Sequence, residues 1–368
     1  MRSIEPYHLN LKFTESPDTH EPNNQVANAT PITGTKKISA TVLPRGDKDE
    51  YLFEAPHQGQ WQIVTLASPR NVDLHYGVYP HPNGSWLPNM ATSDSDGLIV
   101  DLPAAGKYPL RVNAANGNMR SVEPYQLNLT FTASADQHEP NNSAADAKSI
   151  NGTSEILGNI LPRGDRDEFI FDAPAHGQLS VVPLDTPADV KIQYGVYPYP
   201  NGGWLPNLGN KGNAALIVDL PSPGRYVLPT WAATGAMRSI EPYRLGLNFI
   251  ASTDQHEPNN SVANATTISG TGKLSGTLLP RGDRDEFLFN APRAGFWEIR
   301  PIRSPDRVEL GYGVYPHPNG GWLRNTADTN DGLLAIEIPK EGKYVLRIWG
   351  KTGAMRSIEP WEMSLQFK

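Results

Sequence analysis

One unit of 118 residues occurs three times along this chain. The segment MRSIEPY at Met1 returns as MRSVEPY at Met119, as MRSIEPY at Met237 and as MRSIEPW at Met355, so successive copies start 118 residues apart. No residue has been inserted or lost between copies. The repeats that build solenoids span only about 20–50 residues, so a period of this length is that of a whole domain. We therefore expect three similar domains in tandem.

The same repeat sets the domain boundaries. We expect residues 1–13 to be a surplus copy of the unit's last strand, followed by domains over 14–131, 132–249 and 250–368. Because Met1 is in register with the internal methionines, we favour a chain cut from a longer array over one whose translation starts there. Residues 1–13 are polar and alternating, so any secretion signal is expected outside this chain.

Each unit has the pattern of β-structure. Tyr125, Leu127, Leu129 and Phe131 alternate with polar residues, which is typical of a strand with one buried face. Further short apolar runs are separated by turn clusters of Pro, Gly, Asn and Asp. No window of twelve or more residues shows helical periodicity without an interrupting Pro or Gly. The sequence therefore predicts an all-β protein: tandem jelly-roll-like antiparallel β-sandwiches, with seven or eight strands in each unit.

Composition excludes several classes of function. The chain has no cysteine, which excludes disulfides, cysteine-ligated zinc and a thiol nucleophile. Its formal charge is −7 and no five like charges follow one another, whereas binding to nucleic acid needs clustered Lys and Arg. The apolar runs fall far short of the roughly 20 residues that cross a bilayer. We expect neither a nucleic-acid partner nor a membrane span.

Two segments of each unit are rich in oxygen donors. In the second unit, DQHEPNN (136–142) precedes the first strand, and GDRDE (164–168) opens a later one. Calcium is held by six to eight such oxygens, and a proline-stiffened loop can present several of them. The alternative is that Asp and Asn cap turns, with Arg166 or His138 neutralising the carboxylates. The spacing alone leaves both interpretations open.

Several motifs together resemble the bacterial pre-peptidase C-terminal (PPC) domain family. They are Glu-Pro-Asn-Asn, then Gly-Asp-x-Asp-x-aromatic-x-Phe, Gly-x-Tyr-x-Leu and a final Tyr-x-Leu-x-Leu strand, and they recur in essentially every unit. The resemblance implies three tandem copies of a non-catalytic jelly-roll sandwich found on secreted proteases, collagenases and surface proteins. It also implies that some members bind calcium through the linker before the first strand and the Gly-Asp loop.

The resemblance assigns candidate calcium ligands by position in each unit. Carried over to this sequence, they are Glu21, Asn23, Asp47 and Glu50; Glu139, Asn141, Asp165 and Glu168; and Glu257, Asn259, Asp283 and Glu286. The neighbouring Asp49, Asp167 and Asp285 are alternates, because strand alternation can point them towards the aromatic core instead. An extracellular module of this kind is expected to bind calcium with a dissociation constant of only about 10⁻⁴–10⁻³ M.

A second signature, YGVYPHPNGSWL and its copies, places a tryptophan just beyond an Asn-Gly turn. We expect that tryptophan to be partly exposed and able to stack on a sugar ring or on another protein. The candidate contact residues are Tyr79, Trp86, Tyr197, Trp204, Tyr315 and Trp322. The alternative is that each tryptophan covers the end of its own sandwich or packs against the next repeat.

Two further motifs suggest functions that we do not expect. RGD recurs at Arg45, Arg163 and Arg281, but its aspartate has a better role within the Gly-Asp turn than in binding an integrin, and its glycine fits a positive φ. His-Glu at 20–21, 138–139 and 256–257 is followed at once by proline, so the helix and second histidine of a HExxH site are missing. Each lone histidine is expected to be a solvated surface residue, and the protein is not expected to be an enzyme.

The repetition itself suggests the function. A fold needs its apolar pattern repeated, but it does not need MRSIEP or PNGGWLPN repeated; surfaces that meet equivalent neighbours would need that. We expect a non-catalytic extracellular or cell-surface structural protein, calcium-stabilised, whose copies assemble into a filament, sheath or surface layer. The alternatives are an adhesion module that binds polysaccharide or matrix protein, and a C-terminal appendage of a secreted peptidase.

Overall fold

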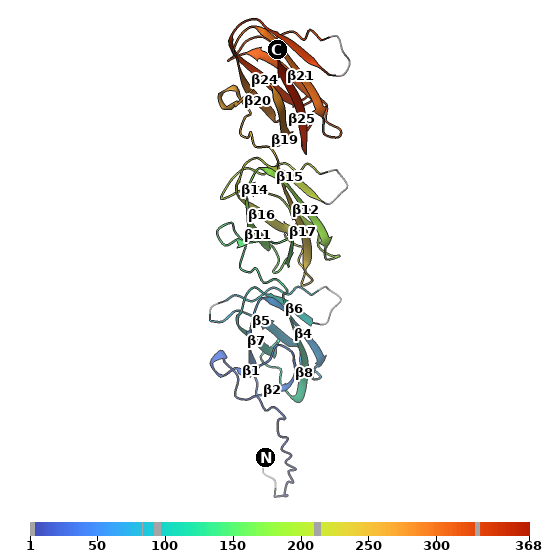
Figure 1. Cartoon of the computed structure of the whole chain (residues 1–368). Helices are drawn as coiled ribbons and strands as arrows, with labels where there is room; N and C mark the ends of the chain where they lie inside the picture. Colours follow the sequence, from blue (N-terminus) through green and yellow to red (C-terminus); the bar gives the residue numbers. More distant parts are fainter. Residues whose placement is uncertain (1–3, 83, 92–96, 210–214, 328–331) are drawn as a thin grey trace.

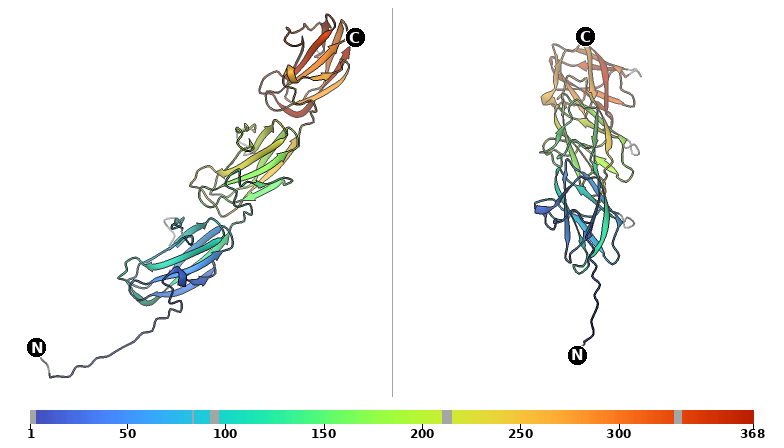
Figure 2. Two further views of the ribbon diagram at one scale, coloured as in Figure 1. Left: turned by 90° about the vertical axis from the view of Figure 1, so that its left-hand side faces the viewer. Right: turned by 90° about the horizontal axis from the view of Figure 1, so that it is seen from below.

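Three β-sandwiches follow one another in a row, with the N-terminal segment extending from one end and the C-terminus at the other (Figure 1, Figure 2). This computed structural model describes residues 4–82, 84–91, 97–209, 215–327 and 332–368. Each sandwich consists of two facing sheets with the apolar core between them. The all-β class expected from the alternating pattern is confirmed.

The first sandwich has one short 3-10 helix, η1 (Val26–Asn28), and eight strands. The strands are β1 (Thr30–Ile32), β2 (Lys36–Val42), β3 (Lys48–Ala55), β4 (Gly59–Ala67), β5 (Leu74–Val78), β6 (Gly97–Leu102), β7 (Gly106–Ala114) and β8 (Ser121–Ala133). One sheet has the order β1-β3-β7-β5 and the other β2-β8-β4-β6.

The second sandwich repeats this plan over nine strands. They are β9 (Lys148–Ser149), β10 (Glu155–Gly158), β11 (Arg166–Ala173), β12 (Gly177–Asp185), β13 (Ile192–Tyr194), β14 (Tyr197–Pro198), β15 (Leu216–Leu220), β16 (Gly224–Ala232) and β17 (Tyr243–Ala251). One sheet has the order β13-β16-β11-β9, with β14 also pairing with β16, and the other β10-β17-β12-β15.

The third sandwich returns to eight strands and includes the short helix η2 (Val262–Asn264). Its strands are β18 (Thr266–Ile268), β19 (Gly272–Leu278), β20 (Arg284–Ala291), β21 (Gly295–Arg303), β22 (Leu310–Pro316), β23 (Leu334–Ile338), β24 (Gly342–Gly350) and β25 (Ser357–Phe367). The sheet orders are β18-β20-β24-β22 and β19-β25-β21-β23.

One strand pair in each sandwich departs from the expected antiparallel arrangement. β1 pairs with β3 in parallel, as β9 does with β11 and β18 with β20, whereas the other pairs are antiparallel. The intervening strand explains this difference. β2 lies in the opposite sheet, so the chain crosses the sandwich and returns before β3 begins, and it can therefore run in the direction of β1.

Strand alternation places large aromatic side chains inside each sandwich. Tyr51, Trp61 and Tyr125 are fully buried in the first core, and the indole N–H of Trp61 donates to the carbonyl of Gly34 over 2.9 Å. A buried indole needs such an acceptor, because an unpaired N–H in an apolar core is costly. The equivalent Trp297 donates to Gly270 in the third core.

Residues 4–13 carry the sequence of a last strand but form no strand in this structure. Ile4, Tyr7, Leu9, Leu11 and Phe13 are 73–102% exposed. In β8 the matching Tyr125, Leu127 and Leu129 are buried and Val122 and Phe131 partly buried, because β8 lies between β2 and β4. The N-terminal segment therefore presents a strand-like apolar face with no sheet beside it (Figure 1).

The second sandwich has Leu179 where the other two have tryptophan, and beside it lies a cavity of about 240 Å³ whose lining includes Phe171 and Phe249. We predict that Leu179→Trp fills this space and places its indole N–H near the carbonyl of Gly152. The second sandwich should gain about 1–3 kcal/mol of stability, measured by calorimetry. The reciprocal change Trp61→Leu should open a cavity in the first sandwich, and a lower midpoint for Leu179→Trp would contradict the prediction.

Candidate cation site and domain junctions

An acidic cluster lies beside the linker at the start of each sandwich. One carboxylate oxygen from each member lies within 4.8 Å of the others. The clusters are Glu21, Asp47 and Asp49; Asp136, Glu139 and Asp167; and Asp254, Glu257 and Asp285. Like charges at such separations repel strongly in a partly buried site, so these clusters are suited to holding a metal ion.

Buried oxygens at these clusters lack hydrogen-bond partners among the described residues. Asn23 and Asn141 are fully buried, and the Oδ1 of each has no hydrogen-bond partner; their counterpart Asn259 donates its Nδ2 to Oδ1 of Asp285 over 3.1 Å. Oδ1 of Asp49 and Oδ1 of Asp167 are also unpartnered, as are Oε1 of Glu257 and Oδ1 of Asn259. Buried polar atoms are almost always paired in folded proteins. Unpaired carboxylate and amide oxygens gathered at one point are the donor set that a hard cation such as Ca²⁺ prefers.

The Gly-Asp aspartates have a different role, that of capping a turn. Oδ2 of Asp47 accepts the backbone N–H of Leu43 over 2.8 Å, and its Oδ1 accepts that of Lys48 over 2.9 Å. Asp165 and Asp283 make the same pairs of bonds. The turn-capping interpretation therefore holds for these residues, although Asp47 also contributes to its cluster. The RGD glycines have φ values of 82–87°, as expected, and the RGD carboxylates are engaged by backbone amides.

Some cluster residues were only alternate ligands in the sequence analysis, and others were not among its candidates. Asp49, Asp167 and Asp285 do point inward, but they reach the acidic end of the core, where Tyr125, Tyr243 and Trp361 donate to them. Asp136 and Asp254 were not candidates. The signal that could have identified them is the return of an aspartate 118 residues after Asp18 in each copy.

Burial and mutual repulsion raise the pKa values of the cluster carboxyls. The pKa of Asp49 is raised to about 8, first by burial and then by the charges of Asp47 and Asp18, while the hydroxyl of Tyr125 opposes the rise. The Gly-Asp aspartates beside the second and third clusters shift in the same direction: the pKa of Asp165 is raised to about 7 and that of Asp283 to about 8, first by burial and then by the neighbouring cluster glutamate. Carboxyls held this far from their ordinary pKa favour either a proton or a cation as partner.

The structure places Glu50, Glu168 and Glu286 outside these clusters. They alternate with the inward aspartates and so lie on the outer face of the sheet, where each forms an ion pair with an arginine over 2.5 Å. Arg111 and Arg347 serve the first and third sandwiches. In the second sandwich the residue equivalent to Arg111 is a proline on β16. Arg166, which lies on β11 two residues before Glu168, forms the ion pair instead.

These ion pairs support the aromatic corner that carries the exposed tryptophans. The hydroxyl of Tyr79 donates to Oε2 of Glu50 over 3.2 Å, and Trp86 packs edge-on against Tyr79 with centroids 4.8 Å apart. Trp86 lies on Gly77, where a Cβ atom would come within 2.8 Å of the indole. Trp86, Trp204 and Trp322 are 53–55% exposed, so the expected partial exposure is confirmed.

The histidines of the His-Glu pairs are half-buried rather than solvated, which corrects the sequence-based expectation. His20, His138 and His256 meet the edges of Tyr51, Phe169 and Phe287, with ring centroids 5.2–5.4 Å apart. The histidine before the cluster glutamate therefore packs against the end of the aromatic core. The polar residues around it in the sequence do not indicate this packing role.

The recurring MRS segment explains how neighbouring sandwiches meet. Nη1 of Arg238 lies 2.8 Å from Oδ1 of Asp101 on β6 of the preceding sandwich. At the next junction, Arg356 makes the same contact with Asp219 on β15 over 2.9 Å. Both aspartates are at least 96% buried. Burial raises the pKa of Asp101, and Arg238 together with the backbone amide of Arg163 opposes that rise.

A second junction contact reaches the acidic clusters. Gln58, from the turn between β3 and β4, donates its Nε2 to Oε1 of Glu139 over 3.3 Å and also to the carbonyl of Leu161. His176 occupies the same position at the next junction, where it is 93% buried, and burial raises the pKa of the neighbouring Glu257. Glu21, which no described sandwich precedes, is exposed. The cluster glutamate is therefore partly covered in the second and third sandwiches, where a preceding domain contacts it, and exposed in the first.

Comparison with known proteins gives no family assignment. No protein-family model matches the chain, and no curated protein matches it either. Solved structures with some likeness include the pre-peptidase C-terminal domain of a Bacillus anthracis collagenase, at 16% identity and TM-score 0.22, covering 29% of this chain and all of that one. The CUB1-EGF-CUB2 region of human MASP-1/3 has 9% identity and TM-score 0.19, covering 59% and 100%.

The extracellular region of zebrafish Gpr126/Adgrg6 also has some likeness, at 9% identity and TM-score 0.21, covering 92% of this chain and 56% of that one. TM-scores this low carry no argument about function. Among the described residues, no helix has the length and apolar character needed to cross a bilayer. The chain is thus described by its own geometry: β-sandwiches, an acidic cluster at the start of each, and one repeated ion pair between them.

Proposed function

We propose that this chain is a non-catalytic, extracellular structural repeat protein of the PPC type, whose sandwiches form a stiff, calcium-stabilised rod that assembles with copies of itself. The observation that carries the proposal is the repeated junction: Asp101–Arg238 and Asp219–Arg356 are the same buried ion pair, 118 residues apart. MRSIEP, one of the two segments that recur beyond the needs of a fold, is the segment that joins neighbours. A contact repeated head to tail along an axis gives an open fibre.

The chemistry of the clusters supports calcium as the stabilising ion. Carboxylates and buried amide oxygens dominate the donors, and the described clusters contain neither cysteine nor histidine, which zinc and the other transition metals prefer. Glu21, Asp49 and Asn23 would hold the ion in the first sandwich, with their counterparts in the others. The bound ion would supply positive charge that neutralises the clustered carboxylates.

The ends of the rod carry complementary charges for a copy of the same chain. Arg120 occupies the position of Arg238 in the first sandwich, and Glu337 that of Asp101 in the third; both are exposed. A second copy that joined here would place its β25 where residues 1–13 would otherwise lie, so those residues would have to turn aside.

Electron microscopy of the purified chain, concentrated and in 10 mM calcium, tests this assembly. We expect linear polymers with a regular rise. Arg120→Glu or Glu337→Arg alone should block them, since each places like charges at the contact, and the two changes together should restore them. Removal of residues 1–13 should leave the polymers intact. Monodisperse rods of single chains under all of these conditions would contradict the proposed assembly.

A second candidate function is adhesion, favoured by the three half-exposed tryptophans. They recur at the same position in each sandwich, so three weak contacts to one extended polymer would add by avidity. Polysaccharide and matrix protein both offer the repeated surface that such spacing requires. This function and the structural one are compatible, because a stiff rod sets the spacing of its contacts.

A further inference from the structure

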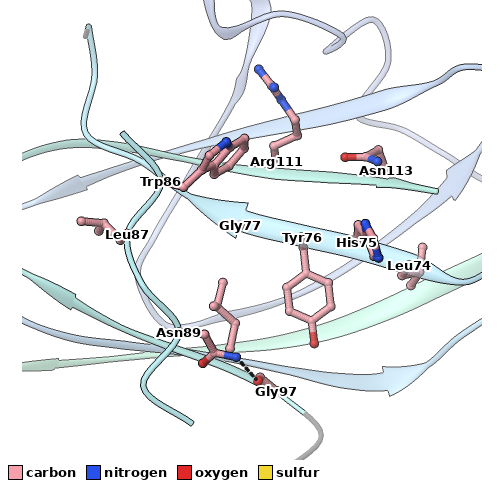
Figure 3. A pocket seen from close by; sticks show the side chains of 11 residues that line it. Leu74, His75, Tyr76, Gly77, Trp86, Leu87, Asn89, Gly97, Arg111 and Asn113 are labelled. Carbon is pink, nitrogen blue, oxygen red and sulfur yellow. Dashed lines mark hydrogen bonds between the residues drawn. The ribbon is translucent and has the colours of Figure 1, made fainter. Parts of the chain in front are cut away.

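A groove beside Trp86 distinguishes the first sandwich from the other two. It has a volume of about 550 Å³ and is lined by His75, Trp86, Asn89, Arg111 and Asn113, together with Leu74 and Tyr76 (Figure 3). β5 and β7 supply most of the lining, and the segment carrying Trp86 and Asn89 forms one wall (Figure 3). The groove is therefore built mainly on paired strands, which hold its side chains in fixed positions.

The residue at position 113 decides whether this groove opens beside the tryptophan. The copies of Asn113 are Trp231 and Trp349, which lie 5.8 Å from Trp204 and 5.6 Å from Trp322, centroid to centroid. In the third sandwich the corresponding hollow, about 560 Å³, is lined by Trp349 and not by Trp322. With asparagine at position 113, the indole of Trp86 borders the groove directly.

The chemistry of the lining fits a neutral sugar. The groove lining includes no carboxylate, and the charge of Arg111 is already paired with Glu50. Across the described residues, the imidazole of His75 has no hydrogen-bond partner, and the amide of Asn113 makes one bond, from Nδ2 to the carbonyl of Ala114. Trp86 is half-exposed, with the guanidinium of Arg111 over its ring at 5.4 Å from the centroid. The exposed part of this indole and the amide and imidazole groups beside it offer both the apolar and the polar contacts that a pyranose ring requires.

We propose that this groove binds a neutral, β-linked oligosaccharide, with one pyranose ring against Trp86 and its hydroxyls towards His75 and Asn113. Rings with equatorial hydroxyls present a flat face of C–H groups to an aromatic side chain, and β-1,4 linkage keeps successive rings extended along a groove. The proposal rests on the adhesion function and assigns it a ligand class and one sandwich of the three.

Titration calorimetry of the whole chain with cellohexaose and with chitohexaose tests the proposal. We expect one of these sugars to bind at one site per chain with a dissociation constant on the order of 10⁻⁵–10⁻³ M. Trp86→Ala should weaken binding about tenfold or more, through loss of the stacking surface. Asn113→Trp should abolish it by packing against Trp86 as Trp349 packs against Trp322, which takes the exposed indole out of the lining, and calorimetric unfolding should show that this variant stays folded.

The matched control is the double change Trp204→Ala and Trp322→Ala, which should leave the affinity within about twofold, because the groove lies in the first sandwich. If a sugar binds but the double change weakens its binding as much as Trp86→Ala does, the adhesion function stands and the assignment to this groove is wrong. If neither sugar binds the unaltered chain, or if Asn113→Trp binds normally, the groove does not bind neutral β-linked sugars.

Discussion

Calcium should raise the thermal midpoint of this protein far more at pH 8 than at pH 5. The reason lies in the cation-free clusters and the Gly-Asp aspartates beside them, where the pKa of Asp49 is about 8, that of Asp283 about 8 and that of Asp165 about 7, against an ordinary value of 3.8. Between pH 4 and 8 the folded chain therefore binds more protons than the unfolded chain. Its stability without calcium must fall as pH rises through this window.

Calcium reverses this penalty because it binds the deprotonated clusters. At a concentration about 100 times the dissociation constant, one ion stabilises its sandwich by about 2.7 kcal/mol, or on the order of 5–15 °C for a domain of this size. Calorimetry in 10 mM calcium and in EDTA, at pH 5 and pH 8, measures the difference. An equal midpoint in calcium and EDTA at pH 8 would remove the ion from the proposed function.

Isosteric amide variants make this test specific. The combined change Asp49→Asn, Asp167→Asn and Asp285→Asn removes one charge from each cluster without altering its shape. In EDTA at pH 8 the variant should be more stable than the unaltered chain, since it relieves repulsion, and its response to calcium should be largely lost. Asp47→Ala should destabilise the first sandwich with or without calcium, because it removes the cap on the turn at Leu43.

The strand pattern predicted the fold well because it depends on local alternation. The apolar residues of β8 occupy the core as their period of two requires, and the glycines of the Gly-Asp turns have the positive φ expected of them. The short parallel strands were not predictable. β1 is only three residues long and its direction depends on where the chain crosses between sheets, which no local pattern records.

The site was harder to predict because adjacent residues of β3 point to opposite faces of the sheet and join different groups of side chains. Asp49 enters the acidic cluster and Glu50 the aromatic corner, although both are acidic, buried and next to each other. Asp49 is an even number of residues from the core side chains Tyr51 and Phe53 and Glu50 an odd number, so strand alternation does predict that Asp49 points inward. It does not reveal that the inward end of the strand meets a second acidic segment, because that depends on how the linker folds back.

The junctions were the least predictable feature, since Asp101 and Arg238 are 137 residues apart in sequence and belong to different sandwiches. Repetition of MRS indicated a surface that meets equivalent neighbours, but not which residue it meets. The partner positions hold Asp101, Asp219 and Glu337, so the acidic character returns in each copy even though the surrounding sequence varies. That recurrence is the one signal the sequence offers.

Replacing Arg238 by alanine should loosen the junction between the first two sandwiches without unfolding either. The change leaves Asp101 buried and without its counter-charge, which typically costs about 3–5 kcal/mol. A sandwich core cannot relieve that cost, but a junction can, by opening and letting water reach the carboxylate. The expected result is a broad distribution of angles between the sandwiches and unchanged unfolding midpoints within them.

The chain has no cysteine, so labels on Glu54→Cys and Thr186→Cys, one in each of the first two sandwiches, report this motion directly by electron paramagnetic resonance. The distance distribution should be narrow in the unaltered junction and broad in Arg238→Ala. Arg120→Ala is the matched control, because Arg120 holds the same position in the first sandwich but meets no described neighbour there; it should leave the distribution narrow. Replacing Asp101 and Arg238 together by leucine should restore much of the order, since it removes both buried charges. If the distribution stays narrow in Arg238→Ala, the linker and Gln58 alone fix the angle between the sandwiches. The ion pair would then not be the contact that makes the array stiff.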